Sequence, residues 1–101
     1  MIAITQENIK EAVKEWCRSP MEAKEKYGDI SNWDVSNVKD MSNMFAYATS
    51  FNQPIGNWNV SNVTDMTEMF YYADSFNQPI DNWNVSNVTD NEDNEDNEDN
   101  E

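Results

Sequence analysis

Apolar and polar positions recur along most of this 101-residue chain with a period of 25 residues. Trp33, Trp58 and Trp83 mark the period, and the segments around them align without gaps. The first unit covers residues 30–54, the second covers 55–79, and a third keeps the pattern only over 80–90. Self-similarity at a short fixed period is typical of proteins built from stacked repeats. The pattern therefore predicts a repeat protein with a partial third unit.

Each unit predicts a short strand followed by a short helix. Ile30, Trp33 and Val35 have the L-x-x-L-x-L spacing of a leucine-rich repeat, which indicates a parallel strand near residues 32–35. A second set of apolar residues has the i, i+3, i+4, i+7 spacing of one helical face: Met41, Met44, Phe45 and Ala48. Asp40 and Asp65 are suitable N-caps for such helices, and Glu68 has the spacing of a capping-box partner.

Residues 1–29 follow a different pattern. An amphipathic stripe after Thr5, a suitable N-cap, predicts a helix with Glu11 and Glu15 facing solvent; the stripe consists of Ile9, Ala12, Val13, Trp16 and Cys17. Ser19-Pro20 is typical of the start of a second helix, and Gly28 of its end. We expect these helices to cover the first repeat, with Trp16 and Tyr27 packed against it.

These elements predict an α/β fold, a short right-handed leucine-rich-repeat-like solenoid with an N-terminal helical cap. The predicted domains are the cap over residues 1–29, the repeats over 30–90, and a disordered acidic tail over 91–101. The three tryptophans are expected to stack inside the coils. Because the third unit loses its apolar pattern at Asn91, we expect the end of the solenoid to be only partly covered at Val85, Val88, Met66, Met69 and Phe70.

Charge excludes some partners. The formal net charge is −14, all six basic residues lie within the first 39 positions, and the last eleven residues carry seven acids. Nucleic acids and anionic membrane surfaces bind clustered Lys and Arg, so both are poor partners for this chain. No apolar run suggests membrane insertion or a signal peptide. A single cysteine, Cys17, cannot close an internal disulfide.

The repeat motif W-[DN]-V-S-N-V-x-D-M-x-x-M-F-x-x-A-x-S-F-N-Q-P-I resembles the BspA-type leucine-rich repeat, including its mycoplasma version of unknown function, from Ile30 to Asp90. The lead-in from Ala23 to Ile30 is also similar to that of family members. The resemblance implies a leucine-rich-repeat-like solenoid, display on the cell surface and, in some members, adhesion to host or partner proteins. It implies no catalytic residues. The missing signal or lipidation peptide departs from the surface-protein pattern.

Enzymatic chemistry finds little support in the sequence. The chain has no histidine, and it lacks a phosphate-binding glycine loop, a nucleophile elbow and a paired-cysteine metal site. Cys17 falls on the apolar stripe of its helix and has no neighbouring base, so we expect a buried, inert thiol. We therefore expect no enzyme, no catalytic residue, no cofactor and no metal.

Stacked repeats would align polar residues in rows, and these rows are the candidate sites. We expect the serine row, Ser36, Ser61 and Ser86, to satisfy backbone groups at the corners together with the neighbouring asparagines, as part of the same structural ladder as the tryptophans. The residues on either side of the inward Trp should face outward, either as structure or as a binding face: Asn32, Asp34, Asn57, Asn59, Asn82 and Asn84.

A third row, formed by Asp40, Asp65 and Asp90, allows a calcium site, because Ca²⁺ binds several oxygen ligands and stacked carboxylates repel one another. Helix N-capping accounts for the same residues. The functional prediction is a non-catalytic repeat module for protein binding or adhesion through the polar face and the acidic end. The alternatives are a structural spacer or scaffold fragment and a calcium-stabilised module. The partner is an unidentified protein, with weak self-association through the uncovered C-terminal end.

Overall fold

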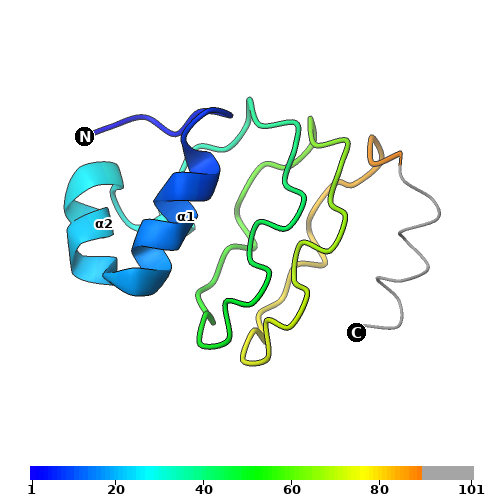
Figure 1. Cartoon of the computed structure of the whole chain (residues 1–101). Helices are drawn as coiled ribbons and strands as arrows, with labels where there is room; N and C mark the ends of the chain where they lie inside the picture. The colour runs from blue at the N-terminus through cyan, green and yellow to red at the C-terminus, as the bar shows by residue number, and fades with distance from the viewer. Residues whose placement is uncertain (90–101) are drawn as a thin grey trace.

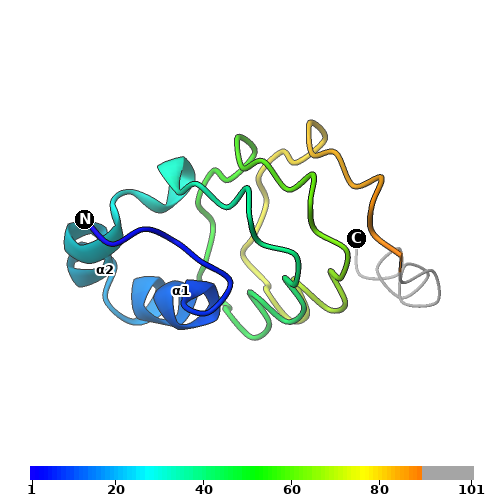
Figure 2. The ribbon, with the colours of Figure 1, turned by 90° about the horizontal axis from the view of Figure 1, so that it is seen from above.

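The computed structural model describes residues 1–89, and Asp90 and the predicted tail lie outside them. Two α-helices begin the chain, α1 (Ile9–Arg18) and α2 (Pro20–Tyr27), and a 3-10 helix, η1 (Ile30–Asn32), opens the first repeat. From there the backbone runs in turns. Successive 25-residue units lie side by side and lead away from the helices in both views (Figure 1, Figure 2). We call residues 30–89 the repeat stack.

Helix α1 forms where the apolar stripe predicts it. Its inward face buries Ile9, Ala12, Val13 and Trp16. The helix begins one turn later than expected, with Asn8 rather than Thr5 in the N-cap position. The Thr5 N–H donates to Asn8 Oδ1 at 2.8 Å, and the Asn8 N–H donates to Thr5 Oγ1 at 3.2 Å. This reciprocal pair satisfies two backbone donors just before the helix.

Helix α2 also follows its sequence signals, with Pro20 in the first turn and Gly28 after the last turn at a φ of 85°. That positive φ favours glycine. The prediction for Glu15 was wrong, because this residue is buried and its carboxylate lies 2.8 Å from Lys26 Nζ. Burying a carboxylate is costly unless it is paired, and α2 supplies the partner. The ion pair therefore ties α1 to α2.

The predicted α/β leucine-rich-repeat-like solenoid is wrong. Residues 1–89 contain helices and turns but no strand and no sheet, and the only β-type pairing between adjacent units of this part of the chain is an isolated parallel bridge between Asp40 and Asp65. The expected strand near residues 32–35 is replaced by tight turns. The Trp33 N–H donates to the Ile30 carbonyl, and the Val38 N–H donates to the Val35 carbonyl. Backbone groups that would form a ladder between strands are used within the unit instead.

The predicted helices within the repeats are also absent. Asn43 and Tyr47 have φ angles of 58° and 64°, and their counterparts Glu68 and Tyr72 have 52° and 56°. These left-handed residues interrupt any helix. Asp40 and Asp65 therefore cap no helix, and Glu68 completes no capping box. The apolar spacing still identifies buried residues, since Met41, Met44 and Phe45 are all in the core.

Backbone N–H groups that would bond within a helix form hydrogen bonds to the next unit instead. The N–H groups of alternate residues in the first unit donate to carbonyls of the second: Met41 to Asp65, Asn43 to Thr67, Phe45 to Met69 and Tyr47 to Tyr71, over 2.7–2.9 Å. We call these four bonds the amide row. They explain why this segment stays extended enough to reach its neighbour although its apolar residues have helical spacing.

Aromatic rings form the core between units. Trp33 stacks on Trp58 with ring centroids 6.3 Å apart, and Phe45 stacks on Phe70 at 5.5 Å. On the side of the helices, Trp16 and Tyr27 contact Trp33 edge-on at 6.1 and 5.7 Å, as the sequence predicts. The helices therefore cover the N-terminal face of the first unit, and the stack continues this packing into the second.

Candidate interaction surface

All six residues of the predicted binding face are exposed, but they fall into two classes. The side-chain oxygens of Asp34, Asn59 and Asn84 accept hydrogen bonds from the backbone N–H two residues on, at Ser36, Ser61 and Ser86. Such Asx turns fix the corner of each unit. The side chains of Asn32, Asn57 and Asn82 form no hydrogen bond with other described residues, so both the oxygen and the nitrogen of each amide are free on this side of the tryptophans.

The tryptophan and serine rows lie at the junctions between units. The Trp58 indole N–H donates to the Ile30 carbonyl at 2.8 Å, and the Trp83 indole N–H donates to the Ile55 carbonyl at 3.0 Å. The first indole, on Trp33, donates instead to the Gly28 carbonyl at 2.9 Å. Trp58 and Trp83 therefore anchor their units to the preceding one, and Trp33 anchors the first unit to the end of helix α2.

Serine backbone carbonyls receive the next set of bonds. Asn62 Nδ2 donates to the Ser36 carbonyl at 2.7 Å, and Asn87 Nδ2 donates to the Ser61 carbonyl at 2.6 Å. The Ser36 hydroxyl also donates to Asp34 Oδ1 at 2.6 Å, which, together with the Ser36 N–H, lowers the pKa of that carboxyl. The two asparagine bonds join side chains to the backbone of the preceding unit, so they hold the units together without a sheet.

The aspartate row makes turns rather than helix caps. Asp40 Oδ1 accepts from the N–H and hydroxyl of Ser42, and Asp65 Oδ1 accepts in the same way from Thr67. Burial raises the pKa of Asp40, but the two bonds from Ser42 and the nearby Lys10 charge outweigh burial and lower it. Among residues 1–89, no group of three potential ligands is arranged to hold a metal ion. Asp90, the third member, is outside the described residues.

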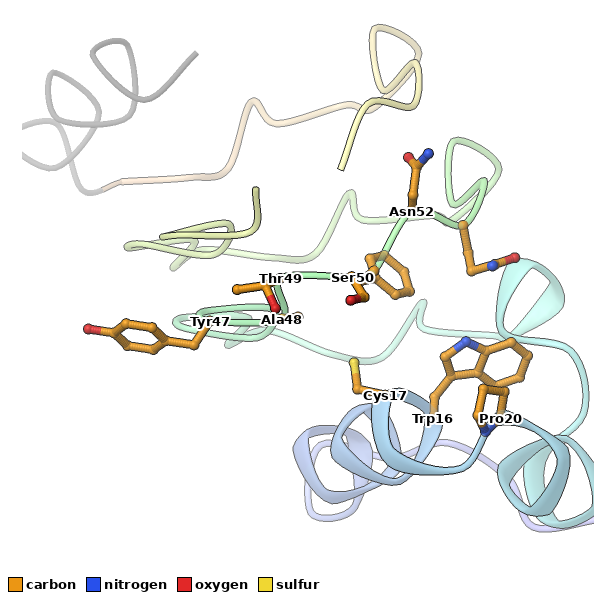
Figure 3. A pocket seen from close by; sticks show the side chains of 10 residues that line it. Trp16, Cys17, Pro20, Tyr47, Ala48, Thr49, Ser50 and Asn52 are labelled. Carbon is orange, nitrogen blue, oxygen red and sulfur yellow. The ribbon is translucent and has the colours of Figure 1, made fainter. Parts of the chain in front are cut away.

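A groove of about 320 Å³ lies between the helices and the first unit (Figure 3). Trp16, Cys17 and Pro20 line the helical side, and residues 47–53 line the other. Cys17 was expected to be buried, yet the residue is exposed. Neighbouring atoms still desolvate its thiol and raise its pKa, which disfavours the reactive thiolate. Lys, Arg, Asp and Glu are absent from the lining, so the groove offers Cys17 no base.

Exposed tyrosines form a second feature of the surface. Tyr47 is 66% exposed and Tyr72 is 56% exposed, and their rings stack at 5.4 Å. Tyr71 contacts both rings at 5.6 and 4.5 Å, and the neighbouring phenol of Tyr72 is the main cause of its raised pKa. Both stacked tyrosines have positive φ, so the turn geometry places these rings outward at the same position of each unit.

The two ends of the repeat stack differ. At the N-terminal end, the Gln6 side chain takes the place of a preceding unit. Its Oε1 accepts from the N–H groups of Lys39 and Asp40 at 2.8 and 2.9 Å, and its Nε2 donates to the Asp40 carbonyl at 3.0 Å. In the second unit the Thr64 and Asp65 N–H groups donate to the Lys39 carbonyl. Gln6 therefore substitutes for a backbone carbonyl, and together with α1 it covers this end.

At the C-terminal end of the described residues, an apolar side chain and a row of backbone N–H groups lack cover from residues 1–89. Val35 and Val60 are each 1% exposed, whereas Val85 is 47% exposed. Met66, Phe70 and Val88 are partly exposed, as expected, although Met69 is buried, which the sequence did not predict. The N–H groups of Met66, Glu68, Phe70 and Tyr72 occupy the positions of the amide row but form no hydrogen bond with described residues. We call these amides and Val85 the open edge.

Comparison with protein families places this repeat pattern. Residues 6–99 match the family described as "Mycoplasma protein of unknown function, DUF285". The chain belongs to this family. The match supports the mycoplasma repeat domain that the motif resembled but not the BspA-type leucine-rich repeat, and the family's description gives no activity. No curated protein and no solved structure matches the chain. The surface of the repeat stack is therefore the source of evidence on the function of this family member.

Sequence reasoning missed several residues of this family member that shape the surface. The Asx-turn residues had a detectable signal, since Asp or Asn is followed two positions later by Ser or Thr at each corner. Gln6 had none, because its role depends on which backbone groups the fold brings to it. Tyr47 and Tyr72 recur at equivalent positions, but their outward direction follows from positive φ angles that the helical spacing concealed.

Proposed function

We propose that this chain is a non-catalytic module that binds another polypeptide at the open edge of its repeat stack. The observation that carries the proposal is the contrast between the two ends. Gln6 and the helices cover one end, whereas at the other end Val85 is 47% exposed and four backbone N–H groups form no hydrogen bond with any residue among 1–89. Exposed apolar surface combined with unpaired backbone donors favours association with another chain.

The free asparagine row supports a secondary contribution. Asn32, Asn57 and Asn82 are exposed and offer amide groups to a partner, whereas Asp34, Asn59 and Asn84 already hold turns. A partner that reached from the open edge onto this row would add polar contacts around an apolar centre, which is the usual organisation of protein interfaces.

The chemistry of the surface supports a non-catalytic role. Cys17, the nucleophile of the groove between the helices and the first unit, has a raised pKa and no carboxylate or amine of the lining beside it. Asp34 and Asp40 have lowered pKa values because serine N–H and hydroxyl groups stabilise their charged forms. General acid–base catalysis instead requires pKa values close to the working pH. The net charge of −14 makes nucleic acid an unfavourable partner.

Site-directed photo-crosslinking tests the proposal. A photoreactive phenylalanine analogue replaces Val85 in one version of the full chain and Asn57 in a control version, and each is irradiated in extract from the native host. The proposal expects a discrete polypeptide crosslinked at position 85. Excess unlabelled native chain should compete for it, and excess Val85→Lys chain should not.

The control distinguishes a specific site from general adhesion. Equal crosslinking at positions 57 and 85, or competition by Val85→Lys as strong as by the native chain, would show that the open edge is not the binding site. Absence of any competed product at position 85 would also overturn the proposal. Circular dichroism of each variant establishes that the fold is retained.

A helix that could span a membrane is not found among residues 1–89.

A further inference from the structure

We infer that the partner of the open edge is a second 25-residue repeat of the same kind, carried by another polypeptide and bound in the register of the internal units. This inference rests on the proposed function and names the chemistry of its partner. It follows from the interface that the first and second units already form, because the open edge presents the same groups again.

The internal interface has a fixed set of hydrogen bonds. The amide row joins alternate N–H groups of residues 41–47 to carbonyls of residues 65–71. The indole of Trp58 binds the Ile30 carbonyl, and the amide of Asn62 binds the Ser36 carbonyl. Asn52 Oδ1 accepts from the Asn77 N–H at 2.8 Å. Both partners of each bond come from positions that recur every 25 residues.

The junction between the second and third units repeats part of this set. Trp83 binds the Ile55 carbonyl, Asn87 binds the Ser61 carbonyl, and the Thr89 N–H donates to the Thr64 carbonyl at 3.1 Å. The same bonds therefore form at two successive junctions. Their recurrence shows that unit-to-unit binding depends on register rather than on one special pair.

The open edge and three acceptors beside it present the next copy of the donors and acceptors of the internal interface. The donors are the N–H groups of Met66, Glu68, Phe70 and Tyr72, at two-residue spacing. The acceptors are the carbonyls of Ile80 and Ser86 and the side-chain oxygen of Asn77, none of which accepts a side-chain bond from a described residue. An incoming unit with tryptophan, asparagine and a row of carbonyls at the repeat spacing would satisfy all of them.

Apolar packing also favours a repeat unit as the partner. Phe70 stacks on Phe76 at 4.4 Å, and both continue the columns that begin at Phe45 and Phe51. Phe45 and Phe51 are buried by the unit that follows them, whereas Phe70 and Phe76 are partly exposed. A phenylalanine pair on the incoming unit would extend both columns and bury the exposed faces.

The sequence of this chain argues against its own C-terminal segment as the occupant. Positions that correspond to Met66, Met69 and Phe70 are Asn91, Asn94 and Glu95. Burying a carboxylate against Phe70 would be unfavourable. A second copy bound through its first unit is also disfavoured, because α1 and Gln6 cover that face. The partner unit must therefore have an uncovered N-terminal face.

A synthetic peptide with the sequence of residues 65–89 is the direct probe, because these residues form one unit in the register that would follow Thr89. The full chain is titrated with this peptide in 0.5 M NaCl, which shortens the screening length to a few ångströms and weakens repulsion between two acidic partners. Calorimetry gives the affinity, and hydrogen exchange measured by NMR gives the location.

The inference makes a residue-specific forecast for exchange. In the free chain, the amides of Met41, Asn43, Phe45 and Tyr47 should exchange at least tenfold more slowly than those of their counterparts 66, 68, 70 and 72. Saturating peptide should slow exchange at 66, 68, 70 and 72 at least tenfold and leave the first set unchanged. A peptide with Trp83→Phe lacks the indole donor and should bind about fivefold more weakly, the equivalent of one hydrogen bond.

Each alternative result is decisive. Failure of the peptide to bind, or binding that leaves the four amides unprotected, would overturn the repeat-in-register inference. A scrambled peptide that binds equally well would do the same. If photo-crosslinking at position 85 nevertheless captured a competed partner, the proposed function would stand with a partner of another kind. If peptide binding occurred without any host partner at position 85, the inference would hold as an intrinsic property and the proposed function would fail.

Discussion

Replacing Trp58 with alanine tests whether the middle of the repeat stack holds the molecule together. Trp58 is 3% exposed, stacks on Trp33 at 6.3 Å and contacts Phe45 at 6.0 Å. Its indole also donates the 2.8 Å bond to the Ile30 carbonyl. The substitution therefore creates a cavity between two aromatic columns and leaves the Ile30 carbonyl without the indole donor.

The expected loss of unfolding free energy is about 3–5 kcal/mol, as for other buried aromatic-to-alanine changes. Two graded variants separate its parts. Trp58→Phe retains a ring but loses the indole bond, so it should cost roughly 1–2 kcal/mol. Trp83→Ala removes the equivalent residue from the last junction, where the side chain is partly exposed, and should cost about half as much as Trp58→Ala.

Urea unfolding followed by circular dichroism measures the three free energies, and scanning calorimetry checks that unfolding is two-state. Circular dichroism follows the loss of helices α1 and α2, and this loss reports unfolding of the whole chain when unfolding is two-state. A loss at Trp58 no larger than that at Trp83 would refute the argument, since it would mean that central position in the stack confers no extra stabilisation.

Three further predictions concern the ends and the corners. Gln6→Ala removes three hydrogen bonds to the backbone of Lys39 and Asp40 and should reduce the unfolding free energy by about 1–3 kcal/mol in urea titrations, whereas Gln6→Glu keeps the acceptor and should lose less. Acid should destabilise the fold as pH falls below about 4, because Asp29, Asp34 and Asp40 have lowered pKa values when folded and the unfolded chain therefore binds protons more tightly. The stability that these carboxylates contribute is present above the unfolded pKa of 3.8 and is lost as pH falls through the folded pKa. Asp34→Asn, which copies the turn residue of the next unit, should reduce this sensitivity in a thermal melt at pH 3, and an unchanged pH profile would contradict the assignment. Raising salt, or deleting residues 91–101, should increase weak self-association measured by light scattering, because the exposed apolar surfaces of two open edges can meet without the hydrogen-bond register of a repeat. Adding one complete unit with a polar end should suppress it, and a monomer under all these conditions would contradict an adhesive open edge.

Some of this protein could be predicted from the sequence alone. The 25-residue period located the units, and the predicted apolar stripe of residues 9–17 located α1 although Cys17 is exposed, because both depend only on spacing along the chain. Proline and glycine set the limits of α2 through their own backbone preferences. Burial of Met41 and Phe45 followed from the same spacing, whatever backbone carried it.

The backbone within the repeats depended on tertiary contacts. Met41 to Ala48 has helical spacing, yet Asn43 and Tyr47 have positive φ and the amides bond sideways to the second unit. The spacing of apolar residues predicts which side chains are buried. It does not predict which carbonyl accepts a bond from a given N–H when that carbonyl lies about 25 residues away in the chain. The predicted strand is absent for a local reason, because the N–H groups of Trp33 and Val38 bond within their own unit and the carboxylate of Asp34 fixes the corner through Ser36.

The candidate site also has features that the sequence predicted and features that only the fold decided. The apolar pattern ends at Asn91, and this change in residue type is enough to identify an uncovered end. Only the fold decided that Asp34, Asn59 and Asn84 hold turns while Asn32, Asn57 and Asn82 stay free, because one side-chain bond to the backbone distinguishes the two rows. Likewise, Gln6 closes one end because folding brings its amide to Lys39 and Asp40, a juxtaposition across more than thirty residues that no local spacing encodes.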